Sequence, residues 1–274
     1  MKIKSKNNIR NHSNFDLTLG LVLIGFILLL IVISLFFTPY NVDTMNVAQR
    51  LVSPGFAHLI GTDNFGRDVF SRIMAGAKFT LFVAVSTVCI GTFFGVNLGL
   101  AAGYFGGAVN ECIMRLIDAL NSFPGILLAL VMVTVLGEGK YTIIVALGIL
   151  FIPSFTRIIR SGTLQYKNSE FIKSAEVFGA SPLQIMFVHI LPNIYPSLLS
   201  AVVVGLSNAI LAESSMSYLG LGIQPPTPSW GRMLFEAQAY LFNAPWIALA
   251  PGVMIMITVL GFNYIGEGIR KRYC

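Results

Sequence analysis

The sequence predicts an all-α polytopic membrane protein with six transmembrane helices, and two observations support this fold class. Of its 274 residues, 55% are hydrophobic and only 11% are charged, whereas soluble domains carry roughly 25% charged residues. The charged residues also gather between long uncharged stretches, as in membrane proteins. The composition therefore argues against a water-soluble fold.

Six stretches meet or approach the length needed to cross a membrane. A helix rising about 1.5 Å per residue needs about 20 apolar residues to span a hydrocarbon core roughly 30 Å thick. The predicted spans are Leu17 to Phe37, Phe79 to Tyr104, Ser122 to Leu136, Tyr141 to Phe155, Ile194 to Ala212 and Trp246 to Ile265. The third and fourth are short, so we expect them to extend into flanking charged residues such as Asp118 and Arg157.

The first span is interpreted as an uncleaved anchor helix. Its apolar stretch is longer than the core of a signal peptide, and the segment FFTPY follows it in place of a small-residue cleavage site. Basic residues flank both ends of the chain: Lys2, Lys4, Lys6 and Arg10 at the start, and Arg270, Lys271 and Arg272 at the end. Because Lys and Arg favour the cytoplasmic side, both termini are predicted to be cytoplasmic, which requires an even number of spans.

This topology divides the chain into four parts. Residues 1–40 contain the cytoplasmic N-terminus and the anchor helix, and residues 41–78 form an external loop. Residues 79–266 form a five-helix core, and residues 267–274 a cytoplasmic C-terminus. In the first helix of that core, glycines recur at every fourth position and predict the close approach of another helix: Gly91, Gly95, Gly99 and Gly103. Two tryptophans, Trp230 and Trp246, are expected at the membrane interfaces.

The long cytoplasmic loop, residues 157–193, carries the clearest functional pattern. Phe171, Ala175 and Phe178 lie at positions i, i+4 and i+7, which predicts a short helix with an apolar stripe. Gly179 is expected to end this helix in a left-handed conformation.

A second helix is predicted directly after the first. Ser181 is suited to the N-cap and Pro182 to the first helical position, and the helix is expected to run to Leu191, before Pro192. A bracket of two helices held by two spans can transmit movement from a soluble motor to the membrane. By spacing alone, an amphipathic connector lying on the lipid surface is an equal alternative.

The bracket resembles the EAA loop of ATP-binding-cassette importer permeases, whose pattern is Glu-Ala-Ala, three residues, Gly, and an Ile-Leu-Pro ending. Here the corresponding residues are Lys173-Ser174-Ala175, then Gly179, then Ile190-Leu191-Pro192. In that family the loop docks on the ATP-binding subunit. The resemblance therefore implies a docking role for Phe171, Lys173, Ser174, Ala175, Glu176, Phe178, Gly179, Ile190, Leu191 and Pro192.

Two positions depart from the family pattern. Lys173 replaces the Glu, and Ser174 replaces the first Ala. The acidic contact made in the family is therefore not transferred to Lys173, and Glu170 or Glu176 is the alternative source of that charge.

Two external segments resemble the second permease subunit of dipeptide, oligopeptide and nickel importers. Residues 60–72, IGTDNFGRDVFSR, match its GTD-x-x-GRD-x-x-SR signature, and residues 218–231, YLGLGIQPPTPSWG, are similar to its later external segment. The resemblance implies a type I ABC importer permease fold in the cytoplasmic membrane. It further implies pairing with a homologous permease, docking of two ATPases and delivery of substrate by an external binding protein. Peptides are the expected cargo, with nickel or another chelated metal as the alternative.

No nucleotide site, cofactor or metal site is expected in this chain. The segment from Gly137 to Tyr141 has Tyr141 where a P-loop needs Ser or Thr, so ATP hydrolysis is assigned to partner subunits and the chain is not expected to be an enzyme. His12, His58 and His189 show no metal-ligand spacing. The competing class is a stand-alone secondary transporter or channel, which predicts inverted repeats and intramembrane charge relays.

Three charged residues are candidates for the transport pathway or its gating. Arg115 and Asp118 lie three positions apart near the third span, and an ion pair between them would lower the cost of burial. Glu213 is the lone acid at the end of the fifth span. Intramembrane carboxylates are functional candidates by default, and a hydrogen-bonded structural role is the alternative.

Overall fold

A computed structural model describes residues 2–273, with side chains described from residue 14 onward. Across this range the regular secondary structure is helical, and extended pairing is limited to one isolated bridge between Thr62 and Asp68. The predicted all-α class is therefore confirmed. The basic side chains near the N-terminus, Lys2, Lys4, Lys6 and Arg10, lie outside the described side chains.

The long helices form the body of the molecule. They are α1 (Lys2–Phe36), α2 (Val69–Phe105), α5 (Lys140–Tyr166), α8 (Leu191–Tyr218) and α10 (Trp246–Tyr273). The shorter elements are α3 (Gly107–Asn121), α4 (Gly125–Leu136), α6 (Glu170–Val177), α7 (Pro182–Gln184), α9 (Trp230–Ala237), 3-10 turns at Val47–Gln49 and Gln238–Tyr240, and a π-helical segment at Ile185–Ile190. Five described helices are long and apolar enough to cross a membrane, or six if the bent pair α3 and α4 counts as one span.

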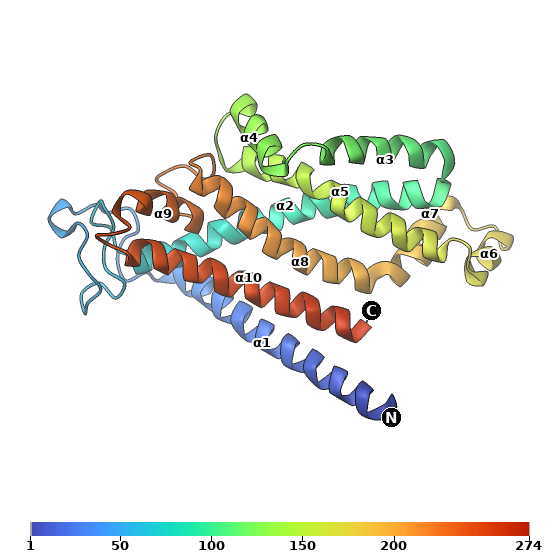
Figure 1. Ribbon diagram of the computed structural model, residues 1–274, viewed down its shortest axis with the longest axis horizontal. Coiled ribbons are helices and arrows are strands. Elements are labelled where there is room, and N and C mark those ends of the chain that lie inside the picture. Colours follow the sequence, from blue (N-terminus) through green and yellow to red (C-terminus); the bar gives the residue numbers. More distant parts are fainter. Residues whose placement is uncertain (1, 274) are drawn as a thin grey trace.

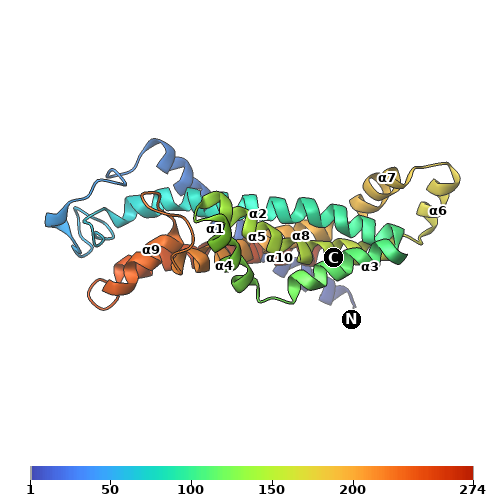
Figure 2. The same cartoon turned by 90° about the horizontal axis from the view of Figure 1, so that it is seen from above.

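The two ends of the bundle carry different elements (Figure 1). The loop between α1 and α2 lies with α9 at one end, whereas α6 and α7 extend from the other. The view from above agrees (Figure 2). The N- and C-terminal ends both lie toward the end that carries α6 and α7, which is the arrangement that an even number of crossings produces.

The predicted third span, Ser122 to Leu136, contains only the 12-residue helix α4, and its N-terminal extension is bent. α3 and α4 meet at a bend of 86°. Pro124 lacks a backbone N–H and disfavours helical geometry at Phe123, so the helix is interrupted there. The expected extension toward Asp118 is thus made by a separate helix, while α5 continues through Arg157 as predicted.

The second span begins earlier than predicted. α2 starts at Val69, before the expected Phe79, because the Asp68 carboxylate caps the helix by accepting the Ser71 N–H at 2.8 Å. The loop predicted to be external therefore ends at Asp68, and the first turns of α2 lie at the end of the bundle that carries this loop.

The glycine row of α2 packs directly against α5. A Cβ added at Gly95 would lie 2.4 Å from the Cβ of Phe155, and one at Gly103 would lie 2.5 Å from the Cβ of Thr163. Gly91 and Gly99 face α5 in the same way. Only glycine permits this backbone approach, so the predicted helix contact is confirmed and its partner is identified as α5.

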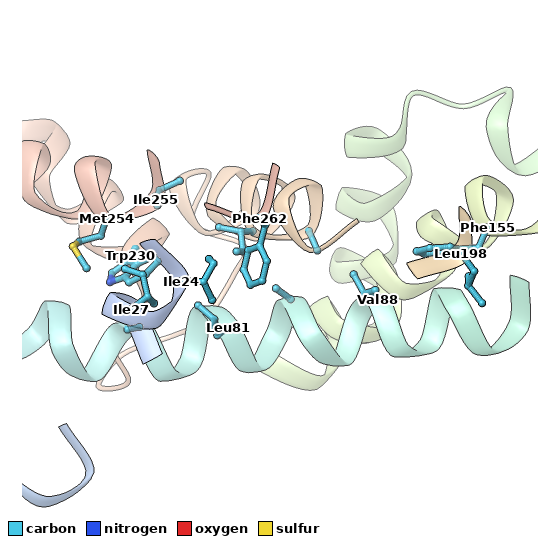
Figure 3. Close-up of a cluster of buried hydrophobic side chains, with 14 of the residues drawn as sticks. Ile24, Ile27, Leu81, Val88, Phe155, Leu198, Trp230, Met254, Ile255 and Phe262 are labelled. Carbon is cyan, nitrogen blue, oxygen red and sulfur yellow. The ribbon is translucent and has the colours of Figure 1, made fainter. Parts of the chain in front are cut away.

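The main hydrophobic core lies between α1, α2, α5, α8 and α10, and α9 folds back onto it (Figure 3). Trp230 of α9 is fully buried there, and its indole N–H donates to the Ile73 carbonyl at 3.1 Å. The expectation that Trp230 anchors the chain at a membrane interface is therefore wrong. Trp246 is partly buried, and its indole N–H donates to the Thr62 carbonyl at 3.4 Å.

Candidate functional site

The first arm of the bracket ends as the sequence predicts. Gly179 has φ of +82°, the left-handed conformation that follows a helix C-terminus. The Ala180 N–H donates to the Ala175 carbonyl and the Gly179 N–H to the Glu176 carbonyl, both at 3.0 Å. These two bonds form a Schellman motif, which stops α6 and turns the chain toward α7.

The second arm differs from the prediction beyond its start. Ser181 caps it by accepting the Gln184 N–H at 3.3 Å, but the helix does not stop before Pro192. The backbone changes to π-type bonding, in which the Leu191 N–H donates to the Met186 carbonyl, and then continues as α8. Proline lacks an N–H and its ring crowds the preceding turn, so a wider π turn accommodates it. The bracket is therefore continuous with the fifth span.

The tip of the bracket exposes apolar side chains that the chain itself does not cover. Phe178 is 89% exposed and Val177 85% exposed. Phe171 and Leu183 are also exposed, whereas Ile172 is fully buried and holds α6 against the bundle. The predicted stripe of Phe171, Ala175 and Phe178 thus faces mainly outward. Val177 and Leu183 extend this stripe, although neither lies at the i, i+4 and i+7 positions that predicted it.

The remaining predicted docking residues divide into exposed and internal ones. Lys173 is exposed and lies 3.5 Å from the Glu170 carboxylate, so these two charges pair within α6. The Ser174 hydroxyl donates to the Glu170 carbonyl at 3.0 Å. Ile190 is fully buried, so it supports the bracket from inside and is not available on its surface. Leu191 is partly buried, and Glu176 and Pro192 are exposed.

The predicted ion pair between Arg115 and Asp118 does not form. Arg115 pairs with Glu111, one turn back on α3. Asp118 faces α5, where the Arg157 guanidinium lies 2.7 Å from its carboxylate. Both side chains of the predicted pair are largely exposed, so burial cost does not drive them together.

Glu213 is enclosed near the C-terminal end of α8. Its side chain is fully buried, and it accepts hydrogen bonds from the Ser217 hydroxyl at 2.7 Å and the Ser214 hydroxyl at 3.4 Å. These contacts supply the hydrogen bonds that a structural role requires. A pathway or gating role for Glu213, Asp118 or Arg115 stays a prediction.

The external signature at residues 60–72 folds around a buried turn. Gly61 and Gly66 have φ of +79° and +75°. A Cβ at Gly66 would lie 1.8 Å from the Asn46 carbonyl oxygen, so only glycine fits there. The Asp63 carboxylate accepts the backbone N–H groups of Phe65 at 2.8 Å and Arg67 at 3.0 Å, which closes the turn.

Arginines of this signature link the loop between α1 and α2 to α9. The Arg67 guanidinium donates to Asp63 and to Glu236, each at 2.6 Å. Arg72 lies 3.7 Å and 3.6 Å from the same two carboxylates. Both guanidiniums are buried, so the acids provide the charge pairing that burial demands. Sequence reasoning missed Glu236, because its distance from the signature along the chain hides the contact.

Comparisons with known proteins agree with this architecture. Residues 95–273 match the family model described as binding-protein-dependent transport system inner membrane component. The chain is 41% identical over 249 residues to the glutathione transport system permease protein GsiD of Pectobacterium atrosepticum, covering 89% of this chain and 83% of the relative. It is 39% identical over 251 residues to the dipeptide transport system permease protein DppC of Alkalihalophilus pseudofirmus, covering 92% and 83%.

A solved structure shares the fold. A chain of the methionine ABC transporter MetNI in an inward-facing conformation superposes with a TM-score of 0.61 at 20% sequence identity. The match covers 74% of this chain and 96% of that one.

Proposed function

Because this chain belongs to the family of binding-protein-dependent transport system inner membrane components, we propose that it forms one half of a pathway that imports small peptides. The relatives named above carry glutathione and dipeptides, and both are short peptides. They favour peptides over the nickel or chelated-metal alternative.

The proposed assembly contains a homologous second permease, two ATPase subunits and an external binding protein. The end of the bundle that carries α6, α7 and both chain ends would face the cytoplasm, where the ATPases dock. The basic residues at Arg270 to Arg272 support this orientation in the inner membrane. The end formed by the external loop and α9 would receive the binding protein.

The proposed mechanism follows from the continuity of the bracket with α8. Closure of the ATPases would push on α6 and α7, and α8 would move as the extension of the second arm. α5 joins the other end of the bracket, and its close packing on the glycines of α2 would carry α2 with it. Such rigid-body movement of packed helices can alternate the access of a central site between the two sides.

The observation that carries this proposal is the exposed apolar tip formed by Phe171, Val177, Phe178 and Leu183. Apolar side chains clustered beyond the ends of the long helices indicate a protein interaction site. A stand-alone transporter or channel does not require an exposed apolar surface of this kind, whereas docking on a soluble ATPase subunit does.

The test uses Phe178→Asp, because Phe178 is almost fully exposed and its replacement leaves the fold intact. We expect the purified complex to lose its ATPase subunits and peptide uptake to stop. Phe242→Asp is the matched control, since Phe242 is 97% exposed in the loop that follows α9. Full retention of ATPase subunits and of peptide-stimulated ATP hydrolysis in Phe178→Asp would show that the docking assignment is wrong.

A further inference from the structure

A pocket of about 480 Å³ opens between the external loop and α9. Its polar lining includes Arg67, Arg232, Glu236 and Asn64. Its apolar lining comes from both segments: Met45 and Phe65 from the loop, Pro225 before α9, and Phe235 and Tyr240 from α9 and the turn after it. Both segments lie at the end of the bundle opposite the bracket (Figure 1).

The charges around this pocket do not balance. Three arginines, Arg67, Arg72 and Arg232, share the carboxylates of Asp63 and Glu236. Among the groups that line the pocket itself, two guanidiniums face one carboxylate. The charge of Asp43 also attracts Arg72, but Asp43 is exposed and does not line the pocket. One positive charge at the pocket is therefore left without a buried counter-charge.

Arg232 is the guanidinium that remains available. Its Nε donates to Glu236 at 3.3 Å, while its terminal nitrogens have no hydrogen-bond acceptor among the described residues. The guanidinium carbon lies 4.6 Å from the centre of the Phe235 ring, which holds its plane at the pocket wall. A planar guanidinium with free terminal N–H groups is suited to bind a carboxylate through two hydrogen bonds.

A polar atom of another residue that lines the pocket also lacks a partner. The Asn64 side-chain oxygen is buried without a hydrogen bond. Buried polar atoms are almost always paired, and an unpaired one indicates a missing partner. The Asn64 oxygen is an acceptor, so it calls for a donor group, whereas Arg232 calls for a carboxylate; Asn64 lies on the loop and Arg232 on α9.

We propose that this pocket is a docking socket for the external binding protein, and that it receives an acidic side chain flanked by apolar residues. This inference rests on the proposed function and adds the surface and the chemistry of the partner. Exposed Met and Phe side chains beside an arginine are the residue types enriched at protein interfaces. The family description itself names dependence on a binding protein, and the pocket lies at the end that such a protein would approach.

The test measures the dissociation constant of the binding protein from the same organism for the complete complex in lipid nanodiscs. Arg232→Glu reverses the free charge, and we expect docking to weaken by about tenfold or more. Asn64→Asp places a negative charge at the pocket, which would repel the acidic side chain of the partner. Asn64 forms no ion pair among the described residues, so this variant keeps the test valid if Arg232→Glu disturbs α9. Both variants are expected to retain their ATPase subunits and basal ATP hydrolysis.

Arg50→Glu is the matched control. Arg50 is exposed in the same external loop and does not line the pocket, so this variant has the same change in net charge. We expect it to alter docking by less than about twofold at physiological salt, where exposed charges are screened.

Two results would overturn the inference alone: unchanged docking in both pocket variants, with or without a higher half-saturating peptide concentration, or an equal loss in Arg50→Glu. Unchanged docking with a higher half-saturating peptide concentration would assign the pocket to substrate. A wild-type chain that binds no ATPase subunits would overturn the proposed function and this inference together.

Discussion

Gly95 of α2 lies so close to Phe155 of α5 that a Cβ at Gly95 would be 2.4 Å from the Cβ of Phe155. The same contact recurs one turn away, at Gly99 with Ile159. These helices therefore interlock along their length and can move together. The bracket is attached to this pair through α5 and to α8 through the π-helical segment.

Replacement of Gly95 tests the interlock. Gly95→Leu should force α2 and α5 apart and lower stability by about 1–3 kcal/mol, the usual cost of overpacking a tight contact. The midpoint of thermal unfolding, followed by size-exclusion chromatography in detergent, should fall. Gly252→Leu in α10 is the control, because a Cβ at Gly252 meets nothing within 4 Å. Equal midpoints in the two variants would contradict the packing argument.

Replacement of Gly179 tests the cost of its backbone conformation without a contribution from steric contacts. A Cβ at Gly179 meets no atom within 4 Å, so any cost of Gly179→Ala comes from its positive φ. We expect about 1 kcal/mol of strain at the end of α6 and weaker ATPase docking. Gly179→Asn should bind the ATPases more tightly than Gly179→Ala, because Asn tolerates the left-handed conformation better. The reverse order would exclude this explanation.

Neutralisation of Glu236 tests the external charge network. Glu236→Gln removes a carboxylate shared by Arg67 and Arg72 and leaves their buried charges less compensated. Breaking a buried ion pair costs roughly 3–5 kcal/mol. Amide hydrogen exchange across residues 60–72 should therefore accelerate. Glu138→Gln is the control, because Glu138 is exposed in the turn before α5. Unchanged exchange in Glu236→Gln would mean that the network does not hold the loop.

Replacement of Trp230 tests the anchoring of α9. Trp230→Phe removes the indole N–H that donates to Ile73 at 3.1 Å and leaves that carbonyl with one hydrogen-bond partner fewer in the core. We expect a loss of about 1–3 kcal/mol, visible in thermal unfolding. Trp246→Phe should cost less, because Trp246 is only partly buried and its bond to Thr62 is longer, at 3.4 Å. A larger loss in Trp246→Phe would reverse this ranking.

Patterns that depend on neighbouring residues were predicted well from the sequence. The left-handed Gly179, the Ser181 cap and the glycine row of α2 were all expected, and the structure contains each of them. These features arise from backbone conformation and helical periodicity, which a few consecutive residues determine.

Features that depend on distant partners were predicted poorly. Asp118 pairs with Arg157 and not with Arg115, and Arg67 pairs with Glu236 on α9. The predicted end of the second helix before Pro192 was also wrong, because a π turn accommodated the proline and the helix continued. For Asp118 and Pro192 a local rule predicted one outcome and a competing contact or backbone adjustment produced another, whereas for Arg67 no partner was predicted.

The sequence by itself determined that this protein is helical and membrane-spanning, and that a bracket whose first arm ends at Gly179 joins two of its spans. The length of an apolar stretch and the identity of capping residues are local properties, so the sequence alone is enough to predict their effects. Only the tertiary structure decided that Phe178 projects outward while Ile172 is buried, and that α9 closes a pocket over Arg67. Burial and charge pairing depend on which helices meet, and that is set by packing over the whole bundle.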